Sequence, residues 1–411
     1  MRVLMIATGY PPYLFSENLC NGKLAMAMLE QGIDVDVISR VDEGPTYGSE
    51  WVAPWDVLKP TANIIQYKAG NKLQQIIDYI YSGLRMGGNF TAGIRWARRA
   101  YEKASTLLNE RHYDVVMTRS PNDIAHLTGL ILKKRYGVKW IANWNDPAAP
   151  IWPAQYKHNY SPKKQKQMMK WTERLLRGAD VNTFPSESLR QHFIENFPFL
   201  VEHKTDVLPH IGLIESAWPR KFENRIKNKL LFLHSGNLSS ERNPDNTFQA
   251  LRKLIDENIF LDFEFHIMGN INDYTSKLII KYKLENYVKC IGSFNYIEAL
   301  SRMQCYDVLV LLEAQLEKGI FFASKFTDYL QTGLPLLAIS PKEGFASKIL
   351  NGQEGEFLAD NTNVDSILNS LKFIVRRWEN GKLNQNASMQ LYKKMLPTHV
   401  ISHLTKIVTE I

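Results

Sequence analysis

Residues 322–335 read Phe322-Ala-Ser-Lys-Phe-Thr-Asp-Tyr-Leu-Gln-Thr-Gly-Leu-Pro335. Within this stretch Ser324–Gln331 is predicted to be a helix, and the apolar run Leu336–Ile339 that follows is typical of a buried strand. Lys325 and Asp328 stand three residues apart, so they share one face of the predicted helix near its first turn. The stretch therefore predicts a piece of an α/β domain with a cation and a carboxylate at the start of a helix.

The same alternation of short apolar runs and helical patterns continues in both directions along the chain. The second half adds the helix Asn246–Glu257 and the apolar runs Leu230–His234, Phe263–Met268, Val288–Ile291 and Val308–Leu312. The first half holds the helix Ser16–Gln31 and the apolar runs Val3–Thr8, Asp34–Ser39, Asn63–Tyr67, Val115–Thr118, Trp140–Asn143, Val181–Thr183 and Asp206–Leu208. Such alternation is typical of parallel sheets with crossover helices.

The length of 411 residues exceeds what one ordinary hydrophobic core organises. Pro209-His-Ile-Gly212 ends the first series of strands, and the polar stretch Pro219–Lys229 has the composition of a linker before the alternation restarts. We therefore expect two doubly wound α/β domains, residues 1–212 and 213–395. The segment Arg40–Asn63, rich in Gly, Pro and Trp, is expected to be a long loop over a cleft.

The composition indicates a folded, soluble protein. Hydrophobic residues make up 45% of the chain and charged residues 22%. No run reaches the ~18 apolar residues that a membrane helix needs, and Met1–Ala7 is too short for the core of a signal peptide. Cys20, Cys290 and Cys305 are widely spaced, which favours a reducing, cytoplasmic setting.

A net charge of +8 favours anionic partners such as nucleotide phosphates, anionic lipid or nucleic acid. Basic residues cluster in Lys133–Arg135, Leu84–Lys103 and Lys157–Arg177. Each cluster fits a solvated helix face, and together they fit peripheral docking on an anionic membrane. After the first strand, Thr8-Gly-Tyr-Pro-Pro12 lacks a dinucleotide fingerprint, and the chain also lacks a phosphate-loop Gly-Lys-Ser/Thr. These absences disfavour dehydrogenases, kinases and ATPases.

The sequence predicts neither a metal site nor a cofactor. The ten histidines are spread along the chain, and we expect no metal-binding cluster among them. Asp34-Val-Asp36 has the form of a metal-binding Asp-x-Asp, but it alternates within a predicted strand. We interpret both carboxylates as structural, at the solvated start of that strand.

Several short segments then come one after another in a definite order. They are Gly9-Tyr-Pro-Pro12, Trp140-Ile-Ala-Asn-Trp-Asn-Asp-Pro147, Pro209-His-Ile-Gly212, Ser235-Gly-Asn-Leu238 with Arg242-Asn-Pro244, and the stretch 322–335. Each is a weak signal alone. In this order and spacing they resemble segments of the retaining GT-B glycosyltransferases of family 4, over nearly the whole chain. The segment at 140–147 is similar to that of a bacterial polysaccharide-building subgroup.

The resemblance implies a GT-B fold, in which two Rossmann-like domains face a cleft. The N-terminal domain would bind the acceptor, with a C-terminal helix of about residues 396–411 packed back on it, and the C-terminal domain would bind a nucleotide sugar. It further implies retaining transfer from a nucleotide diphosphate sugar, with UDP favoured, to a glycan or polyprenyl-linked glycan in cell-surface polysaccharide synthesis. The expected location is the cytoplasm, at the inner face of the cell membrane, without a nucleic-acid partner.

Donor binding is expected in the second domain, at the edge where ligands collect in open α/β sheets. Arg242 and Lys325 can stabilise the leaving phosphate without a metal. Asp328 can accept the ribose hydroxyls. The remaining predicted donor-binding residues are Gly236, Asn237, Gly292, Ser293, Phe294 and Ser324.

On the acceptor side, Asp146 follows a buried strand and precedes Pro147, so it is our catalytic candidate for orienting the acceptor or sharing in proton transfer. An Asx-type turn cap explains the same residue. The other predicted acceptor-side residues are Tyr10, Glu17, Asn18, Asn143 and His210.

The chain departs from the family pattern at several positions. Asn237 stands where many relatives have Arg, Asp328 replaces the usual Glu, and Ile320 stands where relatives have another Glu. Asn143 and Asn145 stand at positions often held by Asp and Arg. Two alternatives therefore stay open: a GT-B nucleotide-sugar epimerase, and a catalytically inactive sugar-nucleotide-binding partner of another transferase.

Overall fold

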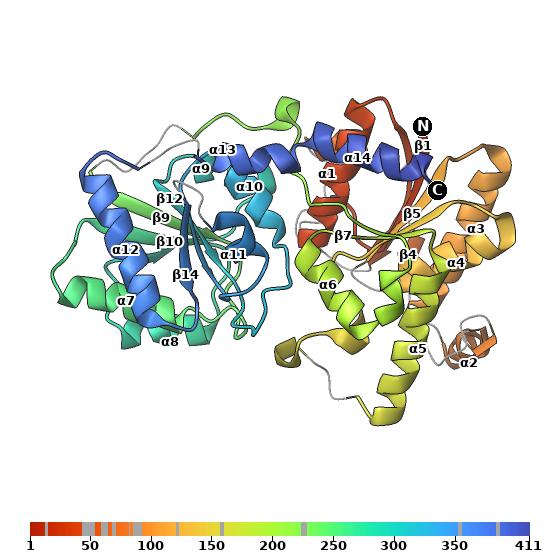
Figure 1. The fold of residues 1–411 in the computed structure, drawn as a ribbon, viewed down its shortest axis with the longest axis horizontal. Helices are drawn as coiled ribbons and strands as arrows, with labels where there is room; N and C mark the ends of the chain where they lie inside the picture. Colours follow the sequence, from red (N-terminus) through yellow and green to blue (C-terminus); the bar gives the residue numbers. More distant parts are fainter. Residues whose placement is uncertain are drawn as a thin grey trace. The chain divides into compact units, whose positions relative to one another are not determined.

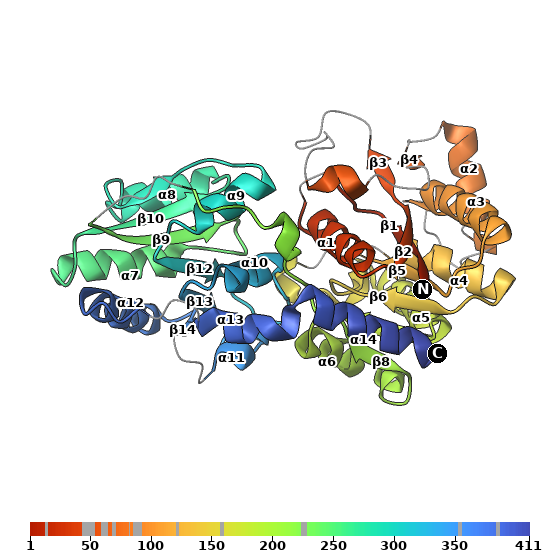
Figure 2. The same cartoon turned by 90° about the horizontal axis from the view of Figure 1, so that it is seen from above.

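The computed structural model describes residues 1–12, 15–42, 54–58, 65–67, 71–81, 83–84, 93–120, 123–156, 160–222, 228–351, 356–383 and 387–411. The chain divides into two compact units. Unit 1 comprises Met1–Ile214 with Pro397–Ile411, and unit 2 comprises Glu215–Leu396. Each unit holds a six-stranded parallel sheet with helices around it (Figures 1 and 2). The predicted α/β class with two doubly wound sheets is confirmed.

The sheet of unit 1 has the strand order β2-β1-β5-β6-β7-β8. Its strands are β1 (Arg2–Ala7), β2 (Asp34–Ile38), β5 (Val115–Arg119), β6 (Trp140–Asn143), β7 (Val181–Phe184) and β8 (Thr205–Val207). Its helices are α1 (Ser16–Glu30), α2 (Lys72–Tyr81), α3 (Ile94–Glu110), α4 (Ile124–Tyr136), α5 (Pro162–Gly178), α6 (Glu187–Asn196) and α14 (Pro397–Thr409).

A small second sheet in unit 1 differs from the sequence expectation. β3 (Arg40–Asp42) pairs in parallel with β4 (Ile65–Tyr67), separately from the main sheet. The expected strand at Asn63–Tyr67 thus joins this ribbon, and the expected loop begins with a strand. The rest of that loop lies outside the described residues, except a 3-10 turn at Trp55–Leu58.

The sheet of unit 2 has the strand order β11-β10-β9-β12-β13-β14. Its strands are β9 (Leu230–Ser235), β10 (Phe263–Met268), β11 (Val288–Cys290), β12 (Val308–Leu312), β13 (Leu336–Ser340) and β14 (Glu356–Asp360). Its helices are α7 (Asp245–Asp256), α8 (Asp273–Lys281), α9 (Tyr296–Met303), α10 (Ser324–Thr332), α11 (Phe345–Leu350), α12 (Val364–Glu379) and α13 (Ala387–Tyr392).

The central strands are buried because helices cover both faces of a parallel sheet. Val3–Ala7 of β1 and Val308–Leu312 of β12 are buried along their whole length. Helices α7, α8 and α12 add apolar side chains to one continuous core with the strands of unit 2. This double burial explains why the strands are near-continuous apolar runs in the sequence.

The C-terminal segment returns to unit 1. Pro397 begins α14, a position where proline costs no helical hydrogen bond. The carbonyl oxygen of Pro397 accepts from Gln31 Nε2 at 3.3 Å, and His403 Nε2 lies 3.1 Å from Asp206 Oδ1. Among the described helices, none has the length and apolar character needed to cross a membrane.

Parallel pairing places the carboxyl ends of all strands of a sheet at one edge. In unit 1 the chain reverses its direction of winding between β1 and β5, and in unit 2 between β9 and β12. Open α/β sheets bind ligands at such switch points, outside the carboxyl ends of the strands. The functional residues are therefore to be sought at these two edges.

Candidate functional site

Three neighbouring strands of unit 2 are each followed by a glycine and a polar residue. The backbone φ angles of these glycines are +130°, +154° and +82°, a region that favours glycine. A Cβ on the second glycine would lie 2.6 Å from the carbonyl oxygen of the first, so the two turns pack closely. The pairs that come after β9, β10 and β11 are Gly236-Asn237, Gly269-Asn270 and Gly292-Ser293.

Hydrogen bonds join these turns into one edge. The Asn270 N–H donates to Asn237 Oδ1 at 2.9 Å, and the Ser293 hydroxyl donates to Asn270 Oδ1 at 3.3 Å. The predicted donor-binding residues after β9 and β11 thus lie together. Gly269 and Asn270 were missed, although a Gly-Asn pair directly after the apolar run Phe263–Met268 was a signal that could have revealed them.

Lys325 reaches this edge from the first turn of α10. A Cβ on Gly236 would overlap Lys325 Nζ, so the ammonium rests directly against the backbone where β9 ends. The Tyr329 hydroxyl holds α10 in place, since it accepts from the Ser235 N–H at 2.8 Å. Glycine at 236 is therefore required both by its φ angle and by the position of the lysine.

The two predicted cations of unit 2 are brought together. Lys325 Nζ is buried and has no hydrogen-bond partner among the residues that the structure describes. Burial, and next the charge of Arg242, lower the pKa of Lys325 to about 7. Arg242 is held in the turn before α7, where its N–H donates to Ser239 Oγ at 3.2 Å. A buried ammonium beside a guanidinium is costly unless an anion joins them, and a diphosphate has the required charge.

Glu313 was not predicted from the sequence, and it lies close enough to Arg242 to feel its charge. It follows the central strand β12, and its N–H donates to Ile339 O at 3.0 Å. Burial raises the pKa of Glu313 to about 7, while the charge of Arg242 opposes this shift. Its place directly after the apolar run Val308–Leu312 was the available signal.

Asp328 and Phe294, both predicted to contact the donor, already have neighbours within unit 2. Asp328 is 5% exposed and accepts from the Tyr296 hydroxyl at 2.8 Å. The Arg302 guanidinium lies over the Phe294 ring at 4.0 Å from its centroid. Their roles toward ribose and base stay predictions, as does that of Ser324, the first residue of α10.

A second polar cluster lies at the carboxyl edge of unit 1. Arg119, at the end of β5, donates through Nε to Asn21 Oδ1 and lies 3.5 Å through Nη2 from Asn145 Oδ1. Asn145 Nδ2 donates in turn to Glu17 Oε1 at 2.5 Å. The predicted Glu17 thus belongs to a connected network, whereas Arg119 was missed because one cation after a strand is a common feature.

Asp146 lies close enough to Glu17 to affect its protonation. Burial, and the nearby charge of Asp146, raise the pKa of Glu17 to about 8, although Arg119 opposes the shift. Glu17 is therefore mainly protonated at neutral pH, beside a second carboxyl group. A protonated carboxyl group beside a second carboxyl group is a frequent arrangement for proton transfer.

The other predicted acceptor-side residues are buried within unit 1, and their roles toward an acceptor stay predictions. Asn143 is fully buried and donates to Thr183 Oγ1 at 2.9 Å, between β6 and β7. Asn18 donates to the carbonyl oxygen of Tyr10 at 3.0 Å, and both residues are buried. Burial and the charges of Arg119 and Lys23 lower the pKa of His210 to about 3, so its imidazole is neutral.

The interpretation of Asp34-Val-Asp36 needs one correction. Asp34 is exposed and pairs with Arg2 at 2.9 Å, as expected for the start of a strand. Asp36, however, is 5% exposed and accepts from the Tyr113 hydroxyl at 2.5 Å, with Arg111 Nη1 at 3.3 Å. Within the described residues, no group of three or more His, Cys, Asp or Glu side chains is placed to hold a metal ion.

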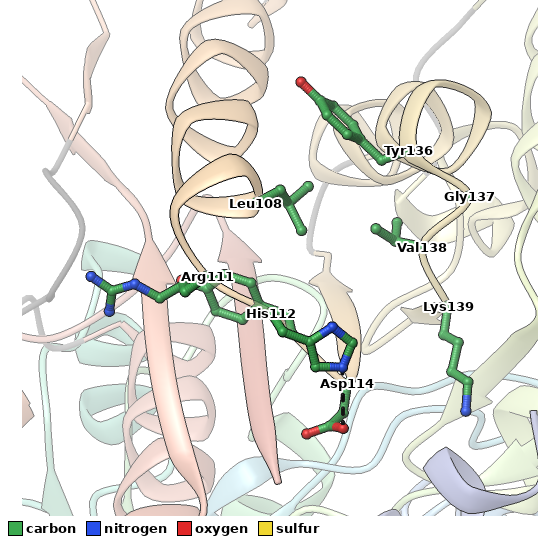
Figure 3. Close-up of a pocket in the computed structure, with 9 residues that line it drawn as sticks. Leu108, Arg111, His112, Asp114, Tyr136, Gly137, Val138 and Lys139 are labelled. Atoms are coloured by element: carbon green, nitrogen blue, oxygen red, sulfur yellow. Dashed lines mark ion pairs between the residues drawn. The ribbon is translucent and has the colours of Figure 1, made fainter.

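A cavity of about 490 Å³ lies at the opposite edge of the unit 1 sheet (Figure 3). Its lining comes from the ends of α3 and α4 and from the residues before β5 and β6, where His112 Nε2 lies 3.7 Å from Asp114 Oδ1. None of the predicted site residues lines it. The cavity therefore lies apart from the clusters at the carboxyl edges.

Comparisons with known proteins cover nearly the whole chain. Residues 22–210 match the family described as Glycosyltransferase Family 4, and residues 217–393 match that described as Glycosyl transferases group 1. No curated protein gives a significant match.

Three solved structures that are similar to this chain over its whole length illustrate the shared fold. HepE of Anabaena in complex with UDP and glucose is 15% identical with a TM-score of 0.69, and covers 100% of both chains. Sucrose-phosphate synthase of Thermosynechococcus elongatus is 13% identical with a TM-score of 0.68, covering 100% of this chain and 98% of that one. A glycosyltransferase of Rickettsia africae is 15% identical with a TM-score of 0.68 and the same coverage. At these identities the likeness establishes the fold alone.

The cation pair of unit 2 can be tested by the binding of UDP in calorimetry. Lys325→Ala and Arg242→Ala are each expected to weaken binding by roughly 1.5–3 kcal/mol, the scale of a charged hydrogen bond. Gly236→Ala should weaken it at least about tenfold, because the new methyl group displaces the Lys325 ammonium.

Gly381→Ala is the matched control, since Gly381 also has a positive φ of +64° but its Cβ would meet open space. Wild-type affinity in both Lys325→Ala and Arg242→Ala would contradict the assignment of this anion site.

Proposed function

The chain belongs to the GT-B glycosyltransferases of the family 4 type, and on this premise we propose that it is a retaining enzyme that uses a nucleotide diphosphate sugar. UDP is the favoured nucleotide, and the acceptor is a glycan or a polyprenyl-linked glycan in cell-surface polysaccharide synthesis. One observation carries the proposal: the buried Lys325 ammonium, beside Gly236 and Arg242, has no described hydrogen-bond partner.

The donor half of the reaction follows from that arrangement. As the bond between the anomeric carbon and the diphosphate breaks, negative charge builds up on the leaving phosphate. Lys325 and Arg242 are already in place, so they stabilise this charge without reorganising. We propose that this pair takes the place of a divalent metal.

The acceptor half is assigned to unit 1. The new bond joins the acceptor oxygen to the anomeric carbon, and the acceptor proton has to leave. We propose that Asp146 orients the acceptor hydroxyl and shares in removing that proton. Glu17, which is mainly protonated at neutral pH, lies close to Asp146, and both Glu17 and Arg119 contact Asn145, the residue before it.

The contribution of Asp146 is tested by steady-state kinetics, with EDTA present throughout. Asp146→Asn is expected to lower kcat and kcat/KM together by ~10²–10⁴-fold while UDP affinity stays at the wild-type value. Asp34→Asn is the control, because Asp34 is an exposed carboxylate of the same unit. If Asp146→Asn turns over at the wild-type rate, Asp146 is a turn cap. If the wild type is inactive in EDTA and manganese restores its activity, metal independence is refuted.

A second assay, without an acceptor, tests the two alternative functions. A panel of UDP, GDP, dTDP and ADP sugars is incubated with the protein, and the free nucleotide is measured. An epimerase releases or inverts the sugar without any acceptor, and an inactive partner binds the nucleotide without releasing it.

We further propose that unit 1 contacts an anionic membrane from the cytoplasm, as a carrier-lipid acceptor requires. Helix α2 supports this proposal of a membrane contact. It lies beside α3 and further from the sheet (Figure 2). Asp78 of α2 pairs with Arg95 of α3 at 2.9 Å, and the next turn of α3 exposes Arg98 and Arg99. The large apolar side chains of α2 are 44–66% exposed and fall on one stripe at helical spacing: Leu73, Ile76, Ile77 and Ile80.

Flotation with vesicles tests this contact. The wild type is expected to float with vesicles of phosphatidylcholine and phosphatidylglycerol, and Ile76→Gln/Ile80→Gln to partition at least about tenfold less, because two apolar groups no longer insert. Ile280→Gln is the matched control, since Ile280 is 63% exposed on α8 of unit 2. Equal flotation of the α2 variant and the control would contradict this assignment.

A further inference from the structure

His234 contributes a second buried polar atom at the donor site. It stands in β9, one residue before Ser235, and is fully buried. Its Nε2 has no hydrogen-bond partner among the described residues, which is also true of Lys325 Nζ. Both nitrogens border the same place, because they are among the three atoms nearest to a Cβ built on Gly236, Nε2 at 4.0 Å.

The backbone fixes which ring nitrogen of His234 carries the proton. Nδ1 lies 3.0 Å from the carbonyl oxygen of Val310. A carbonyl oxygen only accepts, so Nδ1 donates, and Nε2 of the neutral ring is left with a lone pair. Such a lone pair attracts a nearby ammonium group.

The surroundings keep this imidazole neutral. Burial, and next the charges of Lys325 and Arg242, lower the pKa of His234 well below its ordinary value. The other titratable groups around the site are Tyr329 of α10, whose pKa burial raises, and Glu313 after β12. The ring therefore stays an acceptor while Lys325 changes its charge near neutral pH.

We propose that His234 is a positioning residue for Lys325: its Nε2 lone pair attracts the ammonium electrostatically, without a direct hydrogen bond, and so favours its position at Gly236, ready for the donor diphosphate. This inference rests on the proposed function, since the diphosphate is the anion that Lys325 meets. Without the lone pair the ammonium is less stable in its buried position. Lys325 then loses its proton at a lower pH, and donor binding weakens most where the lysine is already partly neutral.

Two substitutions at His234 test the roles of its two ring nitrogens separately. Asn places an amide near the position of Nδ1, so His234→Asn keeps a donor for Val310 O and loses the acceptor. Gln reaches the position of Nε2, so His234→Gln keeps an acceptor that faces Lys325. The dissociation constant of UDP is measured for each variant and for the wild type at pH 6 and pH 8. Ratios to the wild type at the same pH cancel the ionisation of UDP itself.

If the Lys325 pKa falls by one unit, His234→Asn is expected to bind UDP about twofold more weakly at pH 6 and about tenfold more weakly at pH 8. His234→Gln should stay close to the wild type at both pH values. In a Lys325→Met background, adding His234→Asn should not change how the UDP dissociation constant depends on pH, because the titrating lysine is gone. Any pH dependence that comes from Glu313 remains in that background.

Equal weakening by His234→Asn at both pH values would overturn the proposal, because a merely structural role predicts that result. So would a His234→Gln variant that behaves like His234→Asn. Absence of UDP binding in the wild type would instead refute the donor site and the proposed function with it. If the variants do not fold, ¹⁵N spectra of the wild-type histidines decide: a proton on Nδ1 between pH 6 and 8 supports the proposal, and one on Nε2 overturns it.

Discussion

The Lys325 ammonium is buried against the backbone of Gly236, and the organisation of unit 2 around β9 serves to hold it there. An ammonium without an anion is unfavourable in the interior of a protein. Unit 2 tolerates it because Tyr329 anchors α10 to the end of β9 and because glycine at 236 leaves the space that the Nζ atom occupies. An anion bound beside Lys325 would restore the stability lost at this position.

The edge around this position is built from backbone more than from side chains. The glycines after β9, β10 and β11 adopt φ angles that favour glycine, and Gly269 packs closely on Gly236. Exposed backbone near two cations suits a diphosphate, whose charge is spread over several oxygen atoms. Unit 1 differs, because its edge holds a network of side chains in which Arg119 joins Asn21 and Asn145. The first edge thus suits a charged leaving group, and the second suits proton transfer.

Hydrophobic periodicity was enough to predict most of the two sheets from the sequence. Buried parallel strands are apolar on both faces, so most of the strands were visible as short runs. β14 and α12 were not predicted, and the ribbon β3–β4 pairs away from the main sheet. Lys325 and Arg242 could be proposed as site residues because an ordered set of motifs surrounds them.

Side-chain direction and burial could not be predicted from the same patterns. Asn143 stands at the end of a strand, as a ligand-binding residue would, yet the register places it opposite Thr183 and its amide is used there. Asp36 was expected to be solvated and is covered by Tyr113. Glu313 and His234 each stand as a single polar residue beside an apolar run, and only the packing of distant segments makes them part of a site.

A crystal structure with UDP bound tests the central claim most directly. We predict that the β-phosphate lies within hydrogen-bond distance of Lys325 Nζ, against the backbone of Gly236, with Arg242 on the same diphosphate. A nucleotide bound elsewhere, with Lys325 Nζ still without a phosphate oxygen beside it, would contradict the account.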